Sequence, residues 1–361
     1  MTSASSSGLL GCSEPLARHY DVALLDLDGV VYVGPQAVSG APEALAAARE
    51  SGMRLAFVTN NAARPPEVVA AHLSELGIPA QPAEVTTSSQ AAAHYLAERL
   101  APGSPVLVVG TVGLVVALRE RGLEPVERDQ PDVAAVVQGY SPDLTWHQLA
   151  EGAVAINRGV PWIATNLDPT VPSRRGRLPG NGSMVAALRH ATGVDPVSTG
   201  KPDPTMHRES VERSGARNPI VVGDRLDTDI EGANAAGCAS LLVLSGVTNP
   251  AELLAAPPNL RPNFLARDVS GLLDAHPRPR AIDAGFECGT WSVGASGDGA
   301  GVLRSHDAAA VPEPGEAHHA GEALDALRAL CATAWQGRDD VHRWVPADAA
   351  AEAALAELGL G

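Results

Sequence analysis

The chain has 361 residues, of which 45% are hydrophobic and 19% are charged, so it can bury more than one core and is not disordered as a whole. Its 42 acidic residues outnumber the 26 basic ones and give a net charge of −16. That balance disfavours nucleic acid and anionic membrane surfaces as partners. The four cysteines show no CxxC spacing, and no apolar run approaches the roughly 18 residues of a membrane span. We therefore expect a cytoplasmic protein with at least two domains.

The first part of the chain predicts a βαβ unit. After a tail over residues 1–18 that we expect to be disordered, the pattern predicts strands over 22–28 and 54–60 and helices over 39–52 and 64–77. Short β-branched segments thus alternate with Ala- and Leu-rich segments at helical spacing, which is typical of an α/β protein with a parallel sheet.

The same alternation continues through most of the chain. Further strands are predicted over 105–110, 134–140, 161–168, 219–224 and 240–246, and further helices over 113–122, 144–159, 184–193 and 229–237, with a turn-rich stretch over 169–183. From about residue 277 the composition changes to a linker, a hairpin around 297–301 and two amphipathic helices over 320–337 and 348–359. We interpret residues 277–361 as a separate small α+β domain.

Two carboxylates, Asp26 and Asp28, end the first strand and are followed by Gly29. Like charges so close are costly unless a cation compensates them. Residues two apart on a strand face the same way, and ligands in open α/β sheets bind at the carboxyl ends of strands. The pattern favours a binding or catalytic site, although a lone DxDG sequence is equally typical of a turn. Val30 and Tyr32 exclude an EF-hand, because oxygen ligands would be required there.

Two further polar groups have the chemistry of phosphate binding. Thr59 ends the second strand, and its hydroxyl, together with the backbone N–H groups of Asn60 and Asn61, could hold a phosphate oxygen. Taken alone, this segment is more typical of an ordinary turn. Lys201 stands between a glycine and a proline, which restricts its backbone and suits a cation that must stay aimed, although a surface lysine is the commoner occurrence.

Three carboxylates, Asp224, Asp227 and Asp229, follow the predicted strand that ends at residue 224. Several carboxylates at a strand end favour a hard cation such as Mg²⁺. One of them, Asp227, could instead cap the helix that begins near Thr228. The pattern leaves open whether Asp227 or Asp229 lies next to the metal.

Together, the segments DLDGVVY, FVTNN, GNGS, GKPDP and GDRLDTDI resemble the haloacid dehalogenase superfamily over about residues 20–270. The closest resemblance is to subfamily IIA, which holds phosphoglycolate, pyridoxal-phosphate, glycerol-3-phosphate and para-nitrophenyl phosphatases. It implies a Rossmann-like parallel-sheet core of residues 19–88 and 188–274 and an inserted α/β cap of residues 89–187. The spacing independently favours an insertion, since Lys201 follows Thr59 by 142 positions whereas Thr59 follows Asp28 by only 31.

The resemblance also implies a mechanism and a cofactor. Asp26 would be the nucleophile that forms an aspartyl-phosphate, and Asp28 would be the general acid and base. Mg²⁺ would be bound by the Asp26 carboxylate, the Asp28 carbonyl and Asp224, with Asp229 orienting its waters. The residues predicted to contact the phosphoryl group or the rest of the substrate are Gly29, Thr59, Asn60, Asn61, Val171 and Lys201.

The substrate implied by the resemblance is a small phosphorylated metabolite. Val171 stands where the pyridoxal-phosphate branch has a histidine, which favours a small, non-aromatic molecule. Relatives with a C-terminal extension of similar size have glycerol 3-phosphate as an attributed substrate, and this is the substrate we expect. Phosphoglycolate, or a broad range of small phosphoesters and nucleotides, is the alternative. Arg174, Arg175 and Arg177 could attract an anionic leaving group or simply form an exposed basic loop, and a homodimer is left open.

Two interpretations without enzymatic turnover were weighed. A phospho-accepting receiver domain also combines carboxylates, Thr, Lys and Mg²⁺, but it carries its acidic pair before the phosphorylated Asp and has no inserted cap. Asp28, the long gap before Lys201 and the late Asp224 oppose it. A regulator that only binds a metabolite would keep the same fold without needing Asp26 as a nucleophile.

Overall fold

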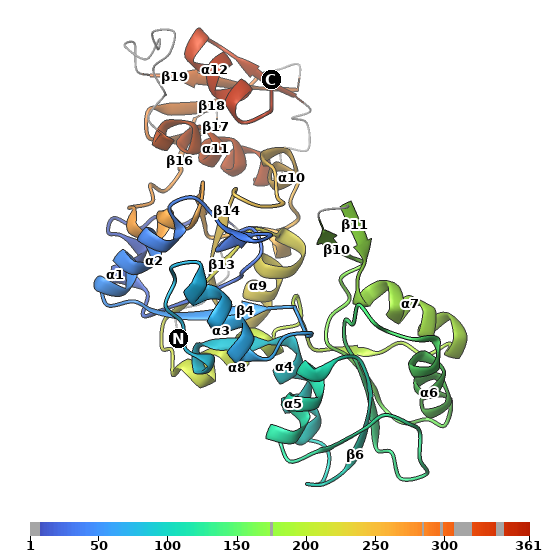
Figure 1. Ribbon diagram of the computed structural model, residues 1–361. Helices are drawn as coiled ribbons and strands as arrows, with labels where there is room; N and C mark the ends of the chain where they lie inside the picture. The colour runs from blue at the N-terminus through green and yellow to red at the C-terminus, as the bar shows by residue number, and fades with distance from the viewer. Residues whose placement is uncertain (1–7, 174–175, 284, 297–298, 307–319, 337–342) are drawn as a thin grey trace.

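The computed structural model describes residues 8–173, 176–283, 285–296, 299–306, 320–336 and 343–361. Three larger β-sheets with their helices form three lobes, and Figure 1 shows the lobe of the first sheet between the C-terminal lobe at the top and the inserted lobe at the lower right. No helix within these described ranges has the length and apolar character needed to span a bilayer.

The first sheet has six parallel strands in the order β15-β14-β13-β1-β4-β5. Its strands are β1 (Val22–Leu25), β4 (Arg54–Thr59), β5 (Val85–Thr87), β13 (Pro219–Gly223), β14 (Ala239–Val243) and β15 (Phe264–Ala266). Its helices are α1 (Leu16–His19), α2 (Ala41–Glu50), α3 (Pro66–Glu75), α8 (Thr205–Ser214), α9 (Glu231–Ala236) and α10 (Pro250–Leu254), and a short hairpin of β2 (Tyr32–Val33) and β3 (Gln36–Ala37) follows β1. This is the predicted Rossmann-like parallel core.

Both faces of this sheet are buried, which explains why its strands are apolar at nearly every position. Leu25 belongs to the apolar cluster shared with α2 and α3, whereas its neighbour Leu24 belongs to the cluster shared with Met206 of α8 and Ala233 of α9. Successive side chains on a strand point to opposite faces, so a parallel strand covered on both sides needs an unbroken apolar run.

The second sheet is the predicted inserted α/β unit, with five parallel strands in the order β12-β9-β8-β6-β7. Its elements are α4 (Ser88–Ala97), β6 (Pro105–Val109), α5 (Val112–Glu120), β7 (Glu124–Val126), β8 (Ala135–Gln138), α6 (Trp146–Asn157), β9 (Trp162–Ala164), α7 (Asn181–Thr192) and β12 (Val197–Ser198). The stretch predicted as turn-rich forms a hairpin of β10 (Thr170–Ser173) and β11 (Gly176–Pro179).

The expected end of the insertion at residue 187 is wrong. Helix α7 runs through that position, and Val185 and Leu188 pack in one cluster with Ile156 of α6. Strand β12 then pairs with β9 of the second sheet. The second sheet therefore extends to residue 198, because the apolar face of α7 is buried on this sheet and not on the first.

The C-terminal sheet has the order β16-β17-β18-β19-β20 and is antiparallel except for the parallel pair β19 and β20. Its elements are β16 (Arg280–Ile282), β17 (Gly285–Cys288), β18 (Trp291–Ala295), β19 (Ala300–Ser305), α11 (Ala320–Trp335), β20 (Arg343–Pro346) and α12 (Ala349–Glu357). Leu327 and Leu330 of α11 share an apolar cluster with Leu242 of β14 and Leu265 of β15. The C-terminal sheet thus forms the expected small α+β region, and its helix α11 packs on the core of the first sheet.

The expected disordered tail is also corrected over residues 8–18, whereas residues 1–7 lie outside the described ranges. Leu9 and Leu16 are buried. The backbone of Cys12 exchanges two hydrogen bonds of 2.8 Å with the backbone of His276. This segment is ordered because its apolar side chains complete two clusters and its backbone pairs with the end of the first lobe.

Candidate active site

The predicted site residues converge because their strands are neighbours in the first sheet. Strand β1 lies between β4 and β13, with Leu25 opposite both Phe57 and Val222. Asp26 follows β1, Thr59 is the last residue of β4, and Asp224 follows β13. In a parallel sheet these ends meet at one edge, which is where ligands bind in such folds.

Three carboxylates form a buried cluster at this edge. Oxygen atoms of Asp26, Asp224 and Asp229 all lie within 4.8 Å of one another. The ammonium of Lys201 donates hydrogen bonds to Asp26 Oδ1, to Asp229 Oδ1 at 2.7 Å and to the Val58 carbonyl at 3.3 Å. Three carboxylates facing one buried ammonium leave an excess of negative charge, which a divalent cation would offset.

Burial and the neighbouring carboxylates raise the pKa values of Asp26 and Asp224 in this cluster. Burial raises the pKa of Asp26 well above its usual range; the Lys201 charge opposes this shift, and the charges of Asp229 and Asp224 add to it. Burial, and then the charge of Asp229, raise the pKa of Asp224 to about 7. Asp224 Oδ1 is buried and has no hydrogen-bond partner among the described residues. An orphaned acceptor inside a carboxylate cluster has the chemistry of a cation ligand.

Two glycines make room for Asp224. A Cβ on Gly29, which has a φ of +88°, would lie 2.5 Å from Asp224 Oδ2, and one on Gly246 would lie 1.9 Å from the same atom. The loop after β14 then holds the carboxylate, because the Val247 N–H donates to Asp224 Oδ2 at 2.7 Å. In the same loop, the Ser245 hydroxyl donates to the Gly29 carbonyl at 2.6 Å. Only residues without a side chain fit this approach.

The acidic run after β13 separates into two environments. Asp229 is buried, and besides Lys201 it accepts a bond of 3.2 Å from the Arg225 N–H. Asp227 forms two bonds with the Arg225 guanidinium, at 3.0 and 2.8 Å. The alternative that Asp227 caps a helix is wrong, since neither the π-helical turn Leu226–Ile230 nor α9 has a side-chain cap. The structure thus places Asp229, and not Asp227, beside the other carboxylates.

The segment after β4 uses its polar side chains mainly within the protein. Thr59 Oγ1 accepts a bond of 3.1 Å from the Asn61 N–H and keeps its own proton for donation. Asn61 Oδ1 accepts from the Ala63 N–H at 2.9 Å. The side chain of Asn60 binds the backbone of Lys201. The two side-chain amides thus hold the loop and the lysine, and of the backbone N–H groups predicted to bind phosphate, that of Asn61 donates to Thr59.

Asp28 lies on the more open side of the cluster. Although part of its side chain reaches solvent, the surrounding protein raises the pKa of Asp28, and the positive charges of Lys201, Arg64 and His72 oppose that shift. A raised pKa shifts this carboxyl group towards the acid form, which is the form that a general acid needs.

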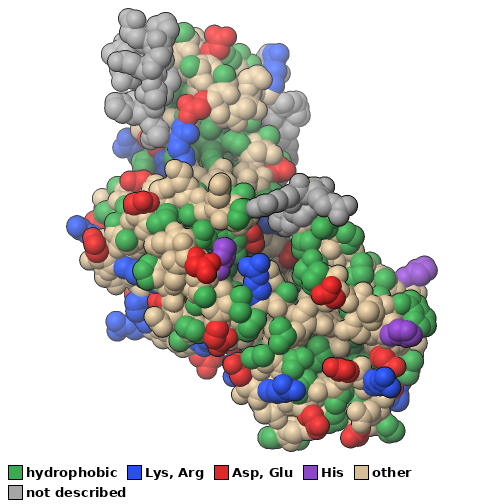
Figure 2. Space-filling view, viewed as in Figure 1, with side chains coloured by type: hydrophobic (Ala, Val, Ile, Leu, Met, Phe, Trp, Pro, Cys, Tyr) green, Lys and Arg blue, Asp and Glu red, His purple; other side chains and the backbone are tan. Residues whose placement is uncertain are grey.

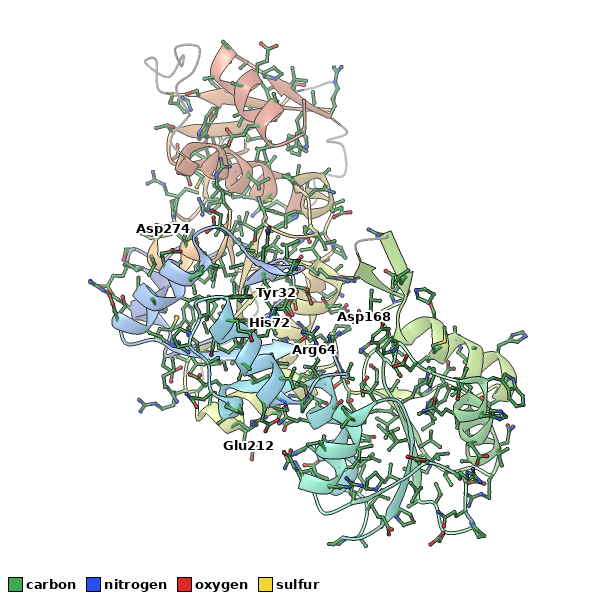
Figure 3. All side chains as sticks on the ribbon, in the orientation of Figure 1. Tyr32, Arg64, His72, Asp168, Glu212 and Asp274 are labelled. Atoms are coloured by element: carbon green, nitrogen blue, oxygen red, sulfur yellow. The ribbon has the colours of Figure 1, made fainter. Side chains whose placement is uncertain are left out.

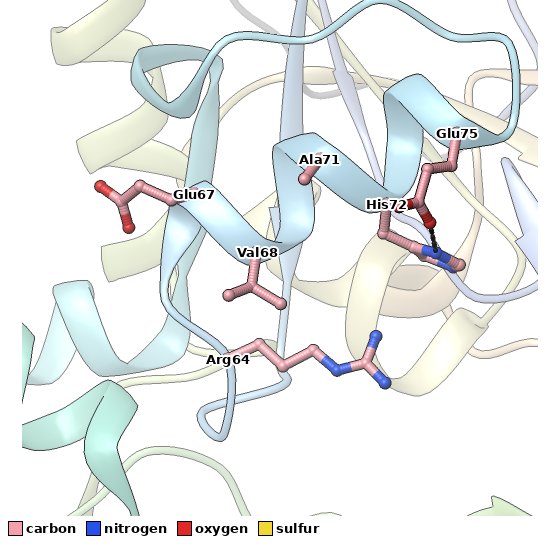
Figure 4. A pocket seen from close by; sticks show the side chains of 6 residues that line it. All are labelled: Arg64, Glu67, Val68, Ala71, His72 and Glu75. Carbon is pink, nitrogen blue, oxygen red and sulfur yellow. Dashed lines mark ion pairs between the residues drawn. The ribbon is translucent and has the colours of Figure 1, made fainter.

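A pocket of about 370 Å³ lies along α3 (Figure 4), and the charges of two of its residues, Arg64 and His72, act on Asp28. It is lined by Arg64, Glu67, Val68, Ala71, His72 and Glu75. The His72 Nδ1 atom lies 3.9 Å from Glu75 Oε2, and the Tyr32 ring meets the His72 ring edge-on with centroids 5.4 Å apart. Figure 3 shows Tyr32, Arg64 and His72 grouped on the first lobe, and Figure 2 shows the surface hollowed where this lobe meets that of the second sheet.

Sequence reasoning missed this group and one further carboxylate, Asp168. Tyr32 lies on β2, Arg64 in the loop before α3 and His72 on α3, and they share no spacing that could have signalled them. Asp168 follows β9 and accepts a bond of 3.0 Å from Asn60 Nδ2. Its place at the end of an apolar strand, in the segment TNLD, was the available signal.

The structure does not bring Val171 into the carboxylate cluster. Val171 lies on β10, opposite Leu178 of β11. Arg177 is exposed on the same hairpin, while Arg174 and Arg175 lie outside the described residues.

Known proteins similar to this chain are phosphatases, and the similarity extends over most of the chain. Residues 23–124 match the family described as haloacid dehalogenase-like hydrolase, and residues 198–272 match a second HAD-hydrolase-like family. The chain is 45% identical over 331 residues to D-glycerol 3-phosphate phosphatase of Mycobacterium tuberculosis, covering 91% of this chain and 90% of that protein. It is 33% identical to an acid sugar phosphatase of Staphylococcus saprophyticus over 71% of this chain and 98% of that protein.

Solved structures show the same relationship. The crystal structure of a glycerol phosphate phosphatase from Mycobacterium tuberculosis in complex with magnesium superposes with a TM-score of 0.85 and 42% identity over 96% of this chain and 99% of that chain. The p-nitrophenyl phosphatase from Archaeoglobus fulgidus superposes with a TM-score of 0.65 and 28% identity over 70% of this chain and 98% of that one. The chain belongs to the haloacid dehalogenase-like hydrolases, among the phosphatases related to the para-nitrophenyl phosphatases.

Proposed function

We propose that this protein is a Mg²⁺-dependent phosphatase that hydrolyses D-glycerol 3-phosphate through an aspartyl-phosphate on Asp26. The observation that carries the proposal is the buried cluster of Asp26, Asp224 and Asp229 around Lys201 at the end of β1. The substrate rests on the 45% identity to a D-glycerol 3-phosphate phosphatase over 90% of that protein.

The residues present fit the cation. The Asp26 and Asp224 carboxylates would hold Mg²⁺ together with the Asp28 carbonyl, and Asp224 Oδ1, which has no hydrogen-bond partner in the part of the chain that the structure describes, would be a ligand atom. Asp229 is held mainly by Lys201, so its role would be to orient the groups that hold the cation. When bound, Mg²⁺ supplies positive charge beside the phosphoryl group and the nucleophile.

The first chemical step belongs to Asp26 and Asp28. Because Lys201 binds Asp26 Oδ1, we assign the attack on phosphorus to the other oxygen, Oδ2. The new bond joins Oδ2 to phosphorus, and the bond from phosphorus to the leaving-group oxygen breaks. Asp28, whose raised pKa favours the acid form, gives its proton to that oxygen.

The second step releases phosphate. Asp28, now ionised, takes a proton from a water molecule that attacks phosphorus. The bond from phosphorus to Asp26 breaks, which restores the carboxylate. In both steps the Thr59 hydroxyl donates to the phosphoryl oxygens, and Lys201 compensates charge on Asp26 and on the phosphoryl group.

The nucleophile is tested by Asp26→Asn, with Asp227→Asn as a matched control. We expect Asp26→Asn to lower kcat for Mg²⁺-dependent phosphate release by about 10³-fold or more, because the amide oxygen is a poor nucleophile. Asp227 faces Arg225, so Asp227→Asn should stay within about twofold of the wild type. Magnesium-dependent release that survives in Asp26→Asn would favour a mechanism without the aspartyl-phosphate.

The substrate is tested by measuring kcat/KM for glycerol 3-phosphate, phosphoglycolate, pyridoxal phosphate and nucleoside monophosphates, with and without Mg²⁺. Glycerol 3-phosphate should give the highest value. A preference for phosphoglycolate or nucleotides would select the alternative substrates, and a preference for pyridoxal phosphate would contradict the interpretation of Val171.

Assembly as a homodimer and a cytoplasmic location stay predictions. Light scattering on the purified protein tests the dimer.

A further inference from the structure

The side-chain amide of Asn60 connects the second sheet to the catalytic lysine, Lys201. Asn60, which follows β4, binds both polar backbone groups of Lys201: its Oδ1 accepts from the Lys201 N–H at 2.9 Å, and its Nδ2 donates to the Lys201 carbonyl at 3.2 Å. Lys201 lies 141 positions farther along the chain. The amide thus fixes the backbone from which the ammonium extends to Asp26 and Asp229.

The second proton of that amide group is held by Asp168 from the second sheet. Asp168 Oδ2 accepts from Asn60 Nδ2 at 3.0 Å. An ionised carboxylate only accepts, so it can bind the NH₂ end of Asn60 and not the oxygen end. A reversed amide would place its NH₂ against the Lys201 N–H and its oxygen against Asp168. Asp168 therefore favours the same orientation that the backbone of Lys201 requires.

The backbone at this junction is equally constrained. Asn166 Nδ2 donates to the Asn60 carbonyl at 2.7 Å, and the Asp168 N–H donates to Asn166 Oδ1 at 3.2 Å. A Cβ on Gly200 would lie 2.1 Å from the Thr165 carbonyl oxygen and 2.8 Å from Asn60 Oδ1. The residue before Lys201 is thus packed directly against the end of β9, with no space for adjustment.

From these contacts we infer that Asp168 is a positioning residue, through which the inserted sheet holds Lys201 in place by way of Asn60. The inference rests on the role proposed for Lys201 in phosphoryl transfer. The inserted sheet would then affect the rate of phosphoryl transfer itself, independently of any recognition of the leaving group. Because Lys201 serves the phosphoryl group, which all substrates share, loss of Asp168 should slow turnover of every phosphomonoester.

The first experiment compares Asp168→Ala and Asp168→Asn with the control Asp195→Ala. Asp195 is an exposed carboxylate that follows α7 of the same lobe and pairs with Arg189. With glycerol 3-phosphate and with p-nitrophenyl phosphate, Asp168→Ala should lower kcat by about 10- to 100-fold, because a misplaced catalytic group costs this much. KM should change by less than about threefold for either substrate. Asp168→Asn should recover most of the activity, since its amide oxygen accepts the same bond, and Asp195→Ala should match the wild type.

Three outcomes would overturn the inference. A rise in KM for glycerol 3-phosphate alone would mean that Asp168 contacts the leaving group. An Asp168→Asn variant as slow as Asp168→Ala would show that the charge matters and not the hydrogen bond. An equal loss in Asp195→Ala would mark a general effect of altering the lobe. If Asp168→Ala does not fold, Asp168→Glu replaces it, and wild-type kcat in that variant would contradict the need for a placed acceptor.

A double-mutant cycle tests the route through Asn60. Asp168→Ala should have little further effect on kcat when Asn60 is already alanine, because the connection is then absent. The same cycle measured as the free energy of urea unfolding should also be non-additive. Additive effects in both would separate Asp168 from Asn60. If the wild type hydrolyses neither substrate, the proposed function fails, while the unfolding cycle still decides whether Asp168 and Asn60 are coupled.

Discussion

His207 is a buried histidine whose ring satisfies no hydrogen bond. It lies on α8, it is 1% exposed, and neither ring nitrogen has a partner among the described residues. Burial, and then the charge of Lys201, lower the pKa of His207 from 6.5 to about 4. The unfolded chain therefore takes up this proton near pH 6.5, while the folded chain stays neutral until about pH 4. This contribution to stability is complete above pH 6.5 and is lost progressively as the pH falls towards 4.

Replacing His207 by leucine should remove this acid sensitivity. The shift corresponds to about 3 kcal/mol between the two pH limits. As the pH drops, the free energy of urea unfolding should therefore decrease less steeply in His207→Leu than in the wild type. The substitution also removes two unsatisfied buried nitrogens, which favours a more stable variant at acid pH. His190→Leu, at an exposed position of α7, is the control. Parallel curves for wild type and His207→Leu would contradict this explanation.

The loop after β14 can position Asp224 because one of its residues, Gly246, has no side chain. An added Cβ at Gly246 would lie 1.9 Å from Asp224 Oδ2 and 2.5 Å from its Cγ. Either the loop or the carboxylate must then move, and the bond from the Val247 N–H to Asp224 is strained or lost.

We expect Gly246→Ala to weaken the response to Mg²⁺. The concentration that gives half-maximal phosphate release should rise by about tenfold or more, as is usual when a group that supports a metal ligand is disturbed. Gly8→Ala, where a Cβ meets no atom within 4 Å, should leave the titration unchanged. A normal Mg²⁺ titration in Gly246→Ala would show that Asp224 is not held by this loop.

Elements with a long apolar pattern were predicted well, and short or polar ones were not. Strands β1, β4, β13 and β14 follow the predicted apolar segments because both faces of the sheet are buried. Strand β5 and helix α4 were missed: the strand has only three residues, two of them threonine, and the helix begins with two serines. Hairpin β10–β11 lies in the stretch predicted as turns, and because all four residues of β11 are exposed, no buried face marks it as a strand.

At the scale of the whole molecule, α11 joins the C-terminal sheet to the first sheet. Leu242, Leu253 and Leu265 of the first lobe are fully buried in the cluster that α11 completes. Arg328 of α11, itself buried, donates to the Leu265 carbonyl at 2.7 Å and contacts His276 Nδ1 at 3.3 Å. Apolar and polar contacts thus make one continuous core of the two lobes.

Removal of residues 277–361 should therefore destabilise the remaining chain. Each exposed leucine loses about 1.5–3 kcal/mol of burial, so the truncated protein should have a lower Tm and aggregate at concentrations where the full chain stays dissolved. A milder variant, Leu327→Ala in the full chain, should lower the free energy of unfolding by about 2–5 kcal/mol. A truncated chain as stable and dispersed as the full one would show that the first lobe does not need the packing of α11.

The sequence by itself determined the chemistry of the strand ends and the class of fold. Asp26, Asp28, Thr59 and Asp224 could be predicted because each lies at or just after the end of an apolar strand, and that relation is local in the chain. The insertion before Lys201 was equally visible as a gap of 142 positions. These features survive without coordinates because the period of burial and the order of motifs are properties of neighbouring residues.

Only the tertiary structure decided which groups meet. Asp229 lies inside the cluster and Asp227 outside it, Asn60 binds Lys201, Asp168 is connected to Lys201 through Asn60, and α11 packs on the first sheet. The tertiary structure also groups Tyr32, Arg64 and His72 beside Asp28. These contacts join residues far apart in the chain, and they depend on how helices and loops pack on the sheet edge, which no spacing in the sequence records.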